Sequence, residues 1–372
     1  MRLAYTEDGY IDWPLIMSYD APYTIVIDAR TRGKTFGLRH QCIKDYVNRG
    51  KRFVELTRVA DFLQGDGKLQ QDYFAKYYTE LPDDRYIREH LLETRGKHAY
   101  IAKRPKDKDE KPSWDVLGYF LALNDAESIK RRSNSFKPVK RYIFDEGLID
   151  KSLPGARYHD YLPGEIGAVA SIMTSVSRER PNTRPEDRPR LYILGNAVDL
   201  TCPWLQHFGI RDVPPYGFSW HYNKKCLLWY GPPDEKWAER QNMSVASGLL
   251  DSADAKSANL NEFATLDADY FSEIPKGARF SFGIVYKQRT FGVWMDMREG
   301  YYYVAPRLPK STDNAPVYAL TSDDARPNYI LAKRAQKSLK GFVSLYYAGI
   351  VKYTDHATRA GFLEALSLYG IR

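Results

Sequence analysis

The chain has 372 residues, a formal net charge of +8 at neutral pH and an isoelectric point of about 9.0. Its apolar and charged fractions are those of an ordinary globular protein long enough for two domains, and no run of about 18 consecutive apolar residues occurs, which excludes a bilayer-spanning helix. The three cysteines lie far apart, which argues against a disulfide framework or a zinc site and fits a reducing cytoplasm.

The first predicted element is a buried strand at Tyr23–Ile27, a short apolar run rich in β-branched residues. A loop follows, and a helix is predicted as far as Asn48, where Gly50 closes it. A second buried strand is predicted at Phe53–Val59. The segment from 28 to 35 therefore joins a strand to a helix.

The next part of the chain predicts hairpins and then a return to alternating strands and helices. Residues 86–123 have the pattern of antiparallel hairpins, with the charged stretch Lys103–Pro112 as an exposed loop. A short strand at Tyr142–Phe144, an amphipathic helix over Pro163–Val176 and a core strand at Leu191–Leu194 follow. Such alternation predicts a mainly parallel sheet that is covered on both faces.

The pattern weakens after about residue 205. We predict a linker region over 206–275, with a polar linker or loop at 244–262. Further strands are predicted at Phe280–Tyr286, Thr290–Met297 and Tyr301–Ala305, and helices at Tyr329–Tyr347 and Thr358–Tyr369. We therefore expect an α/β domain over 1–205 and a second, α+β domain over 276–372.

The strand-to-helix segment carries half of a nucleotide site. A P-loop needs a strand, a loop whose N–H groups hold phosphates, and a helix whose N-terminus faces them. Gly33, Lys34 and Thr35 meet that requirement: Lys34 would neutralise the β- and γ-phosphates, and the Thr35 hydroxyl would bind Mg²⁺. The full P-loop pattern has glycine where Asp28 stands, and an aspartate there repels a polyphosphate unless its side chain points away.

The second half of such a site is an acidic pair at the end of an apolar strand. Asp145 and Glu146 follow the predicted strand Tyr142–Phe144; Asp145 would hold Mg²⁺ and Glu146 would polarise the attacking water. Taken alone, the pair is equally compatible with two acids in a turn. Both halves in the correct order predict an enzyme that hydrolyses ATP with Mg²⁺.

Three further groups are candidates for contact with phosphate. Arg178 and Arg180 follow the helix after the acidic pair, where an arginine could stabilise the γ-phosphate of a neighbouring subunit, although a basic loop is the alternative. Asn196 is a candidate γ-phosphate sensor, or a residue of a turn at the strand end. Arg131 and Arg132 precede the Asp145 strand and could reach phosphate in a neighbouring subunit, or DNA.

These motifs, together with fragments of the second domain, resemble the encapsidation ATPases of small podophages. The matching fragments, in the same order as in the family, are Ser18–Asp20, Val26–Thr35, Phe53–Arg58, Phe144–Glu146, Leu194–Ala197, Phe282–Tyr286, Phe291–Trp294 and Leu320–Asp324. They cover most of the chain apart from roughly 205–275. Fragments spread over both domains are far more specific than a P-loop alone.

The resemblance implies a fold and a function. The fold is a P-loop NTPase domain of the additional-strand type, followed by a vestigial RNase H-like nuclease domain. The function is an ATP-driven motor that translocates viral double-stranded DNA into a preformed prohead. Such motors form a homomeric ring, a pentamer in the family, on the portal of the prohead in the host cytoplasm. Some members dock through a packaging RNA, and no membrane partner is expected.

The resemblance also implies roles for individual residues. The expected catalytic residues are Lys34, Asp145, Glu146 and, as an arginine finger acting on the neighbouring subunit, Arg178. The expected nucleotide-binding residues are Arg30, Gly33, Lys34, Thr35, Phe36, Asn196 and the trans-acting Arg132. The expected metal ligands are Thr35 and Asp145. Asp28 departs from the family's glycine.

The second domain is expected not to cut DNA. An RNase H-like nuclease needs several carboxylates that converge on two metal ions, the first from the middle of the leading strand. The predicted strand Phe280–Tyr286 contains no acid, so Asp296, Asp323 and Asp324 lack that partner. The alternatives are a full terminase that also cuts, and a nucleic-acid-binding assembly protein with a degenerate P-loop.

Positive charge suggests where a polyanion could bind. Lys333, Lys337 and Lys340, with Arg334 beside them, have helical spacing in the predicted helix 329–347. They would contact DNA or packaging RNA, or form a solvated helix face.

Overall fold

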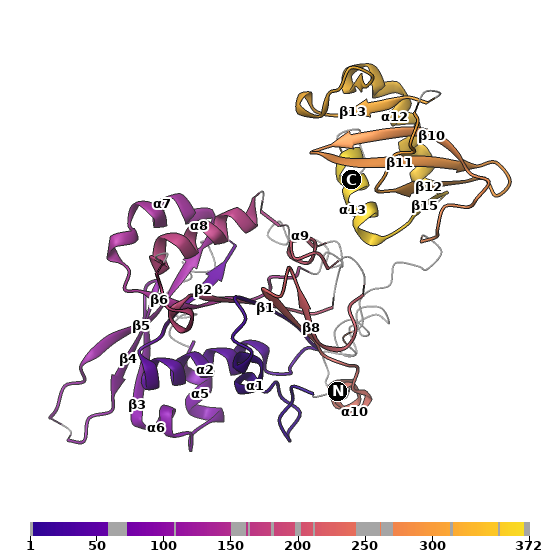
Figure 1. Ribbon diagram of the computed structural model, residues 1–372. Helices are drawn as coiled ribbons and strands as arrows, with labels where there is room; N and C mark the ends of the chain where they lie inside the picture. The colour runs from indigo at the N-terminus through magenta and orange to yellow at the C-terminus, as the bar shows by residue number, and fades with distance from the viewer. Residues whose placement is uncertain are drawn as a thin grey trace. The chain divides into compact units, whose positions relative to one another are not determined.

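The computed structural model describes residues 3–58, 73–107, 109–149, 161–162, 164–179, 182–197, 202–210, 213–242, 261, 271–312, 315–348 and 350–367. The chain divides into two compact units, Met1–Gly209 with Pro214–Ala264 and Ile210–Val213 with Thr265–Arg372. Each unit has its own sheet and its own hydrophobic core (Figure 1).

The first unit is built on a mixed, mainly parallel sheet. In spatial order, the strands found among the described residues are β3 (His90–Arg95), β4 (His98–Lys103), β5 (Trp114–Ala122), β2 (Arg52–Thr57), β6 (Val139–Phe144), β7 (Arg190–Gly195), β1 (Tyr23–Ile27), β9 (Cys226–Tyr230) and β8 (Gly217–His221). From β5 to β9 every neighbouring pair is parallel, and the pairs at the two edges are antiparallel. The predicted α/β class is therefore confirmed.

The position of β7 determines where the two halves of the predicted site meet. It lies between β1 and β6, so that the loop after β1 and the acids after β6 emerge at the same edge of the sheet. Two strand spacings separate β1 from β6, a distance of about 10 Å that side chains can bridge. This insertion is the additional-strand order that the resemblance implies.

Helices cover both faces of this sheet. Among its described residues, the helices of the first unit are α1 (Trp13–Ser18), α2 (Lys34–Arg49), α5 (Ala75–Glu80), α6 (Arg85–Glu89), α7 (Ala126–Arg131), α8 (Glu165–Ser177), α9 (Pro203–His207) and α10 (Glu235–Asn242). Figure 1 shows α1, α2, α5 and α6 on one face and α7 and α8 on the other. No helix in the described part of the chain combines the length and the apolar composition that a membrane crossing requires.

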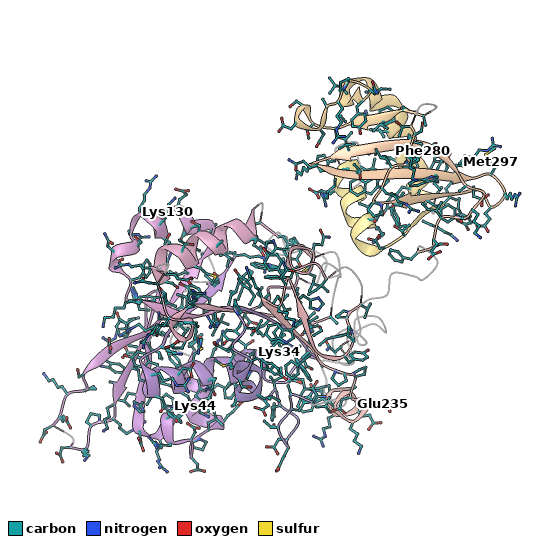
Figure 2. All side chains as sticks on the ribbon, in the orientation of Figure 1. Lys34, Lys44, Lys130, Glu235, Phe280 and Met297 are labelled. Carbon is teal, nitrogen blue, oxygen red and sulfur yellow. The ribbon has the colours of Figure 1, made fainter. Side chains whose placement is uncertain are left out.

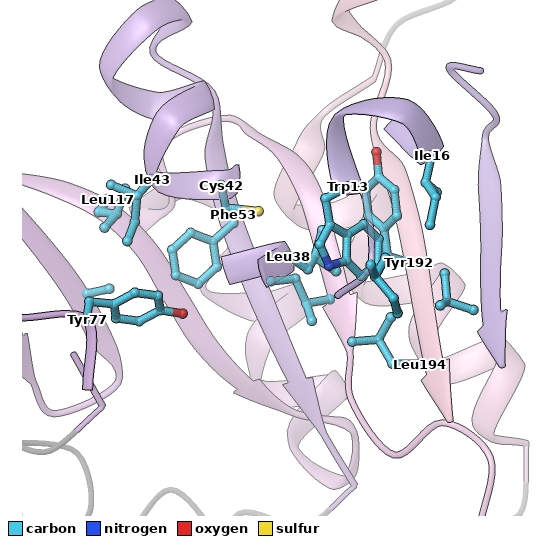
Figure 3. Close-up of a cluster of buried hydrophobic side chains, with 14 of the residues drawn as sticks. Trp13, Ile16, Leu38, Cys42, Ile43, Phe53, Tyr77, Leu117, Tyr192 and Leu194 are labelled. Atoms are coloured by element: carbon cyan, nitrogen blue, oxygen red, sulfur yellow. The ribbon is translucent and has the colours of Figure 1, made fainter. Parts of the chain in front are cut away.

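A buried cluster fixes α2 against the sheet. Leu38 and Cys42 of α2 pack with Trp13 of α1 and with Leu194 of β7, and all four side chains are buried (Figure 3). Complete burial of a large apolar side chain contributes about 1.5–3 kcal/mol. A Cβ atom at Gly37 would lie 2.6 Å from the Trp13 ring, so the two helices approach closely only because this position is glycine. The start of α2 is thereby held at the ends of β1 and β7.

The structure differs from the predicted linker over part of its length. Within 206–275, the strands β8 and β9 join the first sheet and α10 follows them. All five residues of β9 are buried, and the strand pairs in parallel with β1. Flanking Trp, Pro and Gly residues obscure this strand in the sequence. The polar stretch 244–262 lies outside the described residues, apart from Asn261.

The second unit is an α+β unit with a smaller sheet. In spatial order, the strands among its described residues are β14 (Ile330–Leu331), β13 (Val317–Ala319), β10 (Arg279–Tyr286), β11 (Arg289–Asp296), β12 (Tyr301–Ala305) and β15 (Val351–Tyr353). The three long strands β10, β11 and β12 are antiparallel, as predicted, while β13 runs parallel to β10. The helices α12 (Ala332–Tyr347) and α13 (His356–Ser367) contribute Phe342 and Phe362 to one shared core. The short strands β13, β14 and β15 were not predicted.

Candidate functional site

The loop between β1 and α2 has the geometry that a phosphate-binding loop requires. Gly33 has a left-handed backbone, with φ of 75°, and precedes the first residue of α2, Lys34. A side chain at position 33 would also approach Tyr10, since a Cβ atom there would lie 3.3 Å from its Cδ1. The free N–H groups of the first turn and the positive end of the helix dipole favour an anion at this point.

Figure 2 marks the position of Lys34, whose side chain folds back over this loop. Its Nζ donates hydrogen bonds to the carbonyl oxygens of Asp28 and Ala29, each at 2.7 Å, and to Oδ1 of Asn196 at 2.8 Å. Burial of the ammonium lowers the pKa of Lys34 to about 8, and the negative charges of Asp28 and Asp145 oppose that shift. The structure thus brings together Lys34 and Asn196, which lie 162 residues apart in the chain.

Thr35 links the loop to the acidic pair. Its Oγ1 donates a hydrogen bond of 2.8 Å to Oδ2 of Asp145, directly after β6. Burial raises the pKa of the Asp145 carboxyl and nearby Glu55 raises it further, whereas Arg39 opposes the shift. A hydroxyl and a carboxylate are hard oxygen donors of the kind that Mg²⁺ prefers. The donor set therefore fits the magnesium ion expected between Thr35 and Asp145.

Glu146 has an unusual backbone that a buried arginine supports. Its φ is 51°, in the left-handed region that residues with side chains rarely adopt, and its side chain is exposed. The Arg58 guanidinium donates hydrogen bonds to the carbonyl oxygens of Glu146, at 2.7 Å, and of Gly147, at 3.0 Å. Arg58 therefore holds the peptide units on the C-terminal side of the candidate catalytic glutamate.

Arg58 itself is held by a buried carboxylate. It forms two hydrogen bonds with Glu165, at 2.8 and 2.9 Å, and Glu165 accepts a third from Nε1 of Trp204 at 2.8 Å. Both charged side chains are buried, so this bidentate pair is the strong kind of ion contact. The sequence predicts no role for either residue. The available signal was a lone arginine directly after a buried strand.

The side chain of Asp28 points away from the phosphate loop. Its carboxylate accepts hydrogen bonds from the Tyr5 hydroxyl, at 3.1 and 2.9 Å, from Nε1 of Trp229 at 2.9 Å and from the Ala29 N–H at 2.8 Å. Burial raises the pKa of the Asp28 carboxyl, while the charge of Lys34 and these hydrogen bonds oppose the shift. The departure from glycine thus places a carboxylate beneath the loop rather than in the phosphate cradle.

Arg30 and Phe36 occupy the two sides of the loop. Arg30 is exposed, and its carbonyl accepts a hydrogen bond of 3.3 Å from Nε1 of Trp237. The Phe36 ring stacks on Tyr77, with ring centres 4.4 Å apart and planes 11° from parallel. Phe36 therefore also packs against the hydrophobic core.

Arg178 and Arg132 lie away from the phosphate loop of their own chain. Arg178 follows the last residue of α8, and its Nη2 donates to the Ser133 carbonyl at 2.7 Å. The preceding residue, Ser177, bonds to the carbonyl of Val139 at the start of β6, whereas Asp145 follows the end of that strand. The six residues of β6 span about 20 Å, so Arg178 and Asp145 lie near opposite ends of this strand.

The two arginines share one surface. Arg132 is exposed and donates a hydrogen bond of 2.8 Å to Ser128. Arg132 directly precedes the turn whose first residue, Ser133, contacts Arg178. Arg131 is exposed beside it. The other candidate in this region, Arg180, lies outside the described residues.

The acids of the second unit are dispersed. Asp324 accepts hydrogen bonds from the N–H groups of Lys287 and Gln288, each at 2.8 Å, in the turn that precedes β11. Asp296 ends β11 and accepts a hydrogen bond of 2.8 Å from the Arg298 N–H. Opposite ends of an eight-residue strand are about 23 Å apart. Among the described residues, no group of three His, Cys, Asp or Glu side chains could hold a metal ion.

The lysine cluster of α12 is only partly described. Lys340 is exposed on the helix. The side chains of Lys333, Arg334 and Lys337 lie outside the described part of the structure.

Comparisons with known proteins identify relatives over most of the chain. Residues 10–366 match the family of the podovirus DNA encapsidation protein (Gp16). A DNA packaging protein of Bacillus phage B103 is 28% identical over 348 residues, covering 92% of this chain and 96% of the relative. A DNA packaging protein of Bacillus phage phi29 is 26% identical over 347 residues, covering 92% of this chain and 93% of the relative.

A solved structure shares the fold of almost the whole chain. A chain of the bacteriophage Phi-29 viral genome packaging motor assembly is 25% identical, with a TM-score of 0.66, over 96% of this chain and 99% of that one. The family match extends over both units and includes the loop, the acidic pair and the second sheet. The chain therefore belongs to the podovirus DNA encapsidation protein (Gp16) family.

Proposed function

We propose that the chain is the ATP-hydrolysing motor that translocates viral double-stranded DNA into a preformed prohead. The observation that carries this proposal is the 2.8 Å contact between Thr35 and Asp145, which joins the two halves of a nucleotide site in a chain of the encapsidation family. The names of the relatives, DNA packaging proteins of Bacillus phages, support the cellular task.

Each residue at the sheet edge has a role in this proposal. Lys34 exchanges its bonds to the loop carbonyls for the β- and γ-phosphates of ATP, and Thr35 and Asp145 hold Mg²⁺. When bound, Mg²⁺ neutralises charge on the phosphate oxygens. Glu146 orients the attacking water and accepts its proton. Asn196, already in contact with Lys34, senses the γ-phosphate.

The remaining charge on the transferring phosphate is met from the neighbouring subunit. Arg178 and Arg132 are exposed together, remote from the loop of their own chain, which supports action in trans. The proposed assembly is a homomeric ring, the pentamer of the family, on the portal of the prohead in the host cytoplasm. A packaging RNA is its further proposed docking partner.

The second unit is proposed to be a vestigial RNase H-like domain without nuclease activity, with 276–372 as its proposed bounds, whereas the first domain extends past residue 205 to include β8 and β9. The spatial order β12-β11-β10-β13-β14, with three antiparallel strands followed by two parallel ones, supports the RNase H-like assignment. The dispersal of Asp296 and Asp324 to opposite ends of β11 supports the absence of cutting.

The direct test is ATP turnover by the purified full-length protein, with and without double-stranded DNA. Lys34→Ala should reduce turnover at least about a hundredfold, because it removes the positive charge at the phosphates. Glu146→Gln should retain nucleotide binding and lose the chemical step. Lys44→Ala is the matched control, because Lys44 lies on the same helix and its ammonium contacts Asp84, at 3.7 Å, and the Tyr86 ring, at 5.6 Å, rather than the phosphate loop. Turnover by Lys34→Ala at the parental rate would refute the assignment.

A further inference from the structure

One aromatic side chain beside the phosphate loop is left without a role by the proposed chemistry. The Tyr10 side chain is 50% exposed, although it directly adjoins Gly33. Large aromatic rings that adjoin a buried framework are usually covered, because exposure forgoes the free energy of burial. An exposed ring at the rim of a nucleotide loop therefore has surface available for a ligand.

The ring is held in place rather than free to fold onto the surface. The Tyr10 and Trp237 rings form a T-shaped pair, with an angle of 82° between their planes and centres 5.6 Å apart. The Tyr10 carbonyl accepts a hydrogen bond of 2.8 Å from the Thr6 N–H, and the Ile11 N–H donates to the Arg32 carbonyl at 3.1 Å. The first bond closes a turn within the N-terminal segment, and the second ties that segment to the phosphate loop directly after Tyr10.

The support beneath Tyr10 is itself rigid. Trp237 is buried and lies over the Arg32 guanidinium at 4.1 Å, and Tyr5 covers the other side at 4.6 Å. Arg32 is fixed by hydrogen bonds of 2.7 Å to the Gly9 carbonyl and to Asp234. A platform that is ordered before the ligand arrives loses little entropy on binding.

The direction of a bound nucleotide follows from the sheet. The contact between Thr35 and Asp145 marks the metal and γ-phosphate end, which lies toward β6. On the opposite side of β1 lies β9, followed by α10 with Trp237. A triphosphate whose terminal phosphate is at Asp145 therefore carries its nucleoside past Gly33, toward Tyr10.

We propose that Tyr10 binds the base of the nucleotide by stacking, with Trp237 as its buried support. This inference rests on the proposed ATPase function and adds to it the site of the base. Every base has an aromatic face, so stacking contributes affinity with little discrimination between bases. ATP and GTP should therefore depend on Tyr10 to a similar degree.

The experiment compares ligands with and without a base. Full-length protein is titrated by calorimetry, in Mg²⁺, with a non-hydrolysable ATP analogue, the corresponding GTP analogue and inorganic tripolyphosphate. Tyr10→Ala should weaken both nucleotides between about fivefold and a hundredfold, the usual range for loss of one base stack. Its affinity for tripolyphosphate should stay within about twofold of the parent. Tyr10→Phe, which keeps the ring, should bind all three ligands like the parent.

The matched control is Tyr222→Ala. Tyr222 is 46% exposed and lies in the turn between β8 and β9. This turn comes before β9, which runs parallel to β1, whereas the phosphate loop comes after β1, so the two lie at opposite ends of the strands. Tyr222→Ala should leave all three affinities unchanged. A Tyr10→Ala protein that loses tripolyphosphate affinity as strongly as ATP affinity would show that the ring shapes the loop, and would overturn the proposal.

Two further outcomes separate this inference from the proposed function. Unchanged nucleotide affinity in a folded Tyr10→Ala protein would overturn base stacking while leaving the ATPase proposal intact. A parental protein that binds neither nucleotide nor tripolyphosphate would overturn both. Steady-state kinetics give an independent measurement, because loss of a stack should raise KM for ATP and leave kcat within about twofold.

Discussion

The Thr35 hydroxyl lies 2.8 Å from a carboxylate oxygen of Asp145, although 110 residues separate them in the chain. The contact exists because β7 is inserted between β1 and β6, which sets the two strand ends at a distance that two short side chains can span. Neither residue is unusual by itself. Their joint position is what supports the proposed site for a metal ion and a phosphate chain at this end of the sheet.

Arg58 should control the chemical step through the backbone of Glu146. Removing its bonds to the carbonyls of Glu146 and Gly147 frees a left-handed peptide to relax, and a misplacement of about 1 Å can cost about a hundredfold in rate. Arg58→Lys should therefore lower kcat for ATP strongly, with nucleotide affinity within about threefold of the parent. Unchanged kcat in a folded variant would contradict this role.

A matched ion pair distinguishes positioning from general stability. Arg141 and Asp45 form another buried pair, at 2.9 Å, between the start of β6 and α2. Lysine at either position keeps the positive charge but loses the paired hydrogen bonds of the guanidinium, which should cost about 1–3 kcal/mol of unfolding free energy. Arg141→Lys should therefore destabilise the protein to a similar extent as Arg58→Lys, yet keep kcat near the parental value in its folded fraction.

Asp28→Gly, which introduces the glycine of the full P-loop pattern, should destabilise this chain. The Tyr5 hydroxyl and the Trp229 N–H would lose their shared acceptor, and buried Arg32 would lose a nearby carboxylate at 3.9 Å. Each unsatisfied group costs about 1–3 kcal/mol, so we expect a total loss of about 3–5 kcal/mol in denaturant unfolding.

The control for this prediction is a carboxylate of a surface pair. Asp125 contacts Lys97 at 3.0 Å with both side chains about one-third exposed, so Asp125→Ala should cost less than about 1 kcal/mol. An Asp28→Asn protein as stable as the parent would show that charge on this side chain contributes nothing to the fold.

Arg178 should act on the neighbouring subunit. An Arg178→Ala subunit should be inactive in pure rings, because each nucleotide would lack a charge that offsets the developing negative charge on phosphate. Mixed with Glu146→Gln subunits, it should recover part of the turnover, since each variant supplies what the other lacks. Mixed rings that stay inactive at every ratio, with co-assembly verified, would exclude a role in trans.

The second unit should leave DNA intact. Carboxylates at opposite ends of β11 cannot converge on two metal ions at one phosphate. Supercoiled plasmid incubated with full-length protein and millimolar Mn²⁺ should therefore keep its mobility. Nicking that co-purifies with the protein and disappears in Asp296→Ala or Asp323→Ala would make the chain a cutting terminase.

Local patterns were sufficient for the elements that carry the phosphate loop and the acidic pair. The runs at Tyr23–Ile27 and Tyr142–Phe144 are apolar; the first is followed by the phosphate loop and the second by the acidic pair. Both strands and the order of the two motifs could therefore be predicted from the sequence. The sequence pattern also predicts β7 as a strand. Its place between β1 and β6 is implied only by the resemblance, because strand order depends on contacts between residues that are far apart in the sequence.

The residues that support the site could not be predicted, because their partners lie far away in the sequence. Arg58 is a single charged residue after a strand, and its partner Glu165 comes 107 residues later. The acceptor role of Asp28 depends on Trp229, 201 residues away, and on Tyr5 near the N-terminus. Sequence analysis could identify Asp28 as a departure from the pattern, but not the direction of its side chain.

The surroundings of Asp28 make that departure hard to reverse by single mutations. A Cβ atom at Gly231 would lie 2.4 Å from Oδ2 of Asp28, so position 231 must remain glycine while the aspartate is present. Tyr5 and Trp229 in turn present donors that need an acceptor at position 28. Glycine can therefore replace this aspartate without a loss of stability only through coordinated changes at several sites. The effect of any mutation at one of these positions thus depends on the residues at the others. The network that supports the loop therefore couples the mutations of these positions.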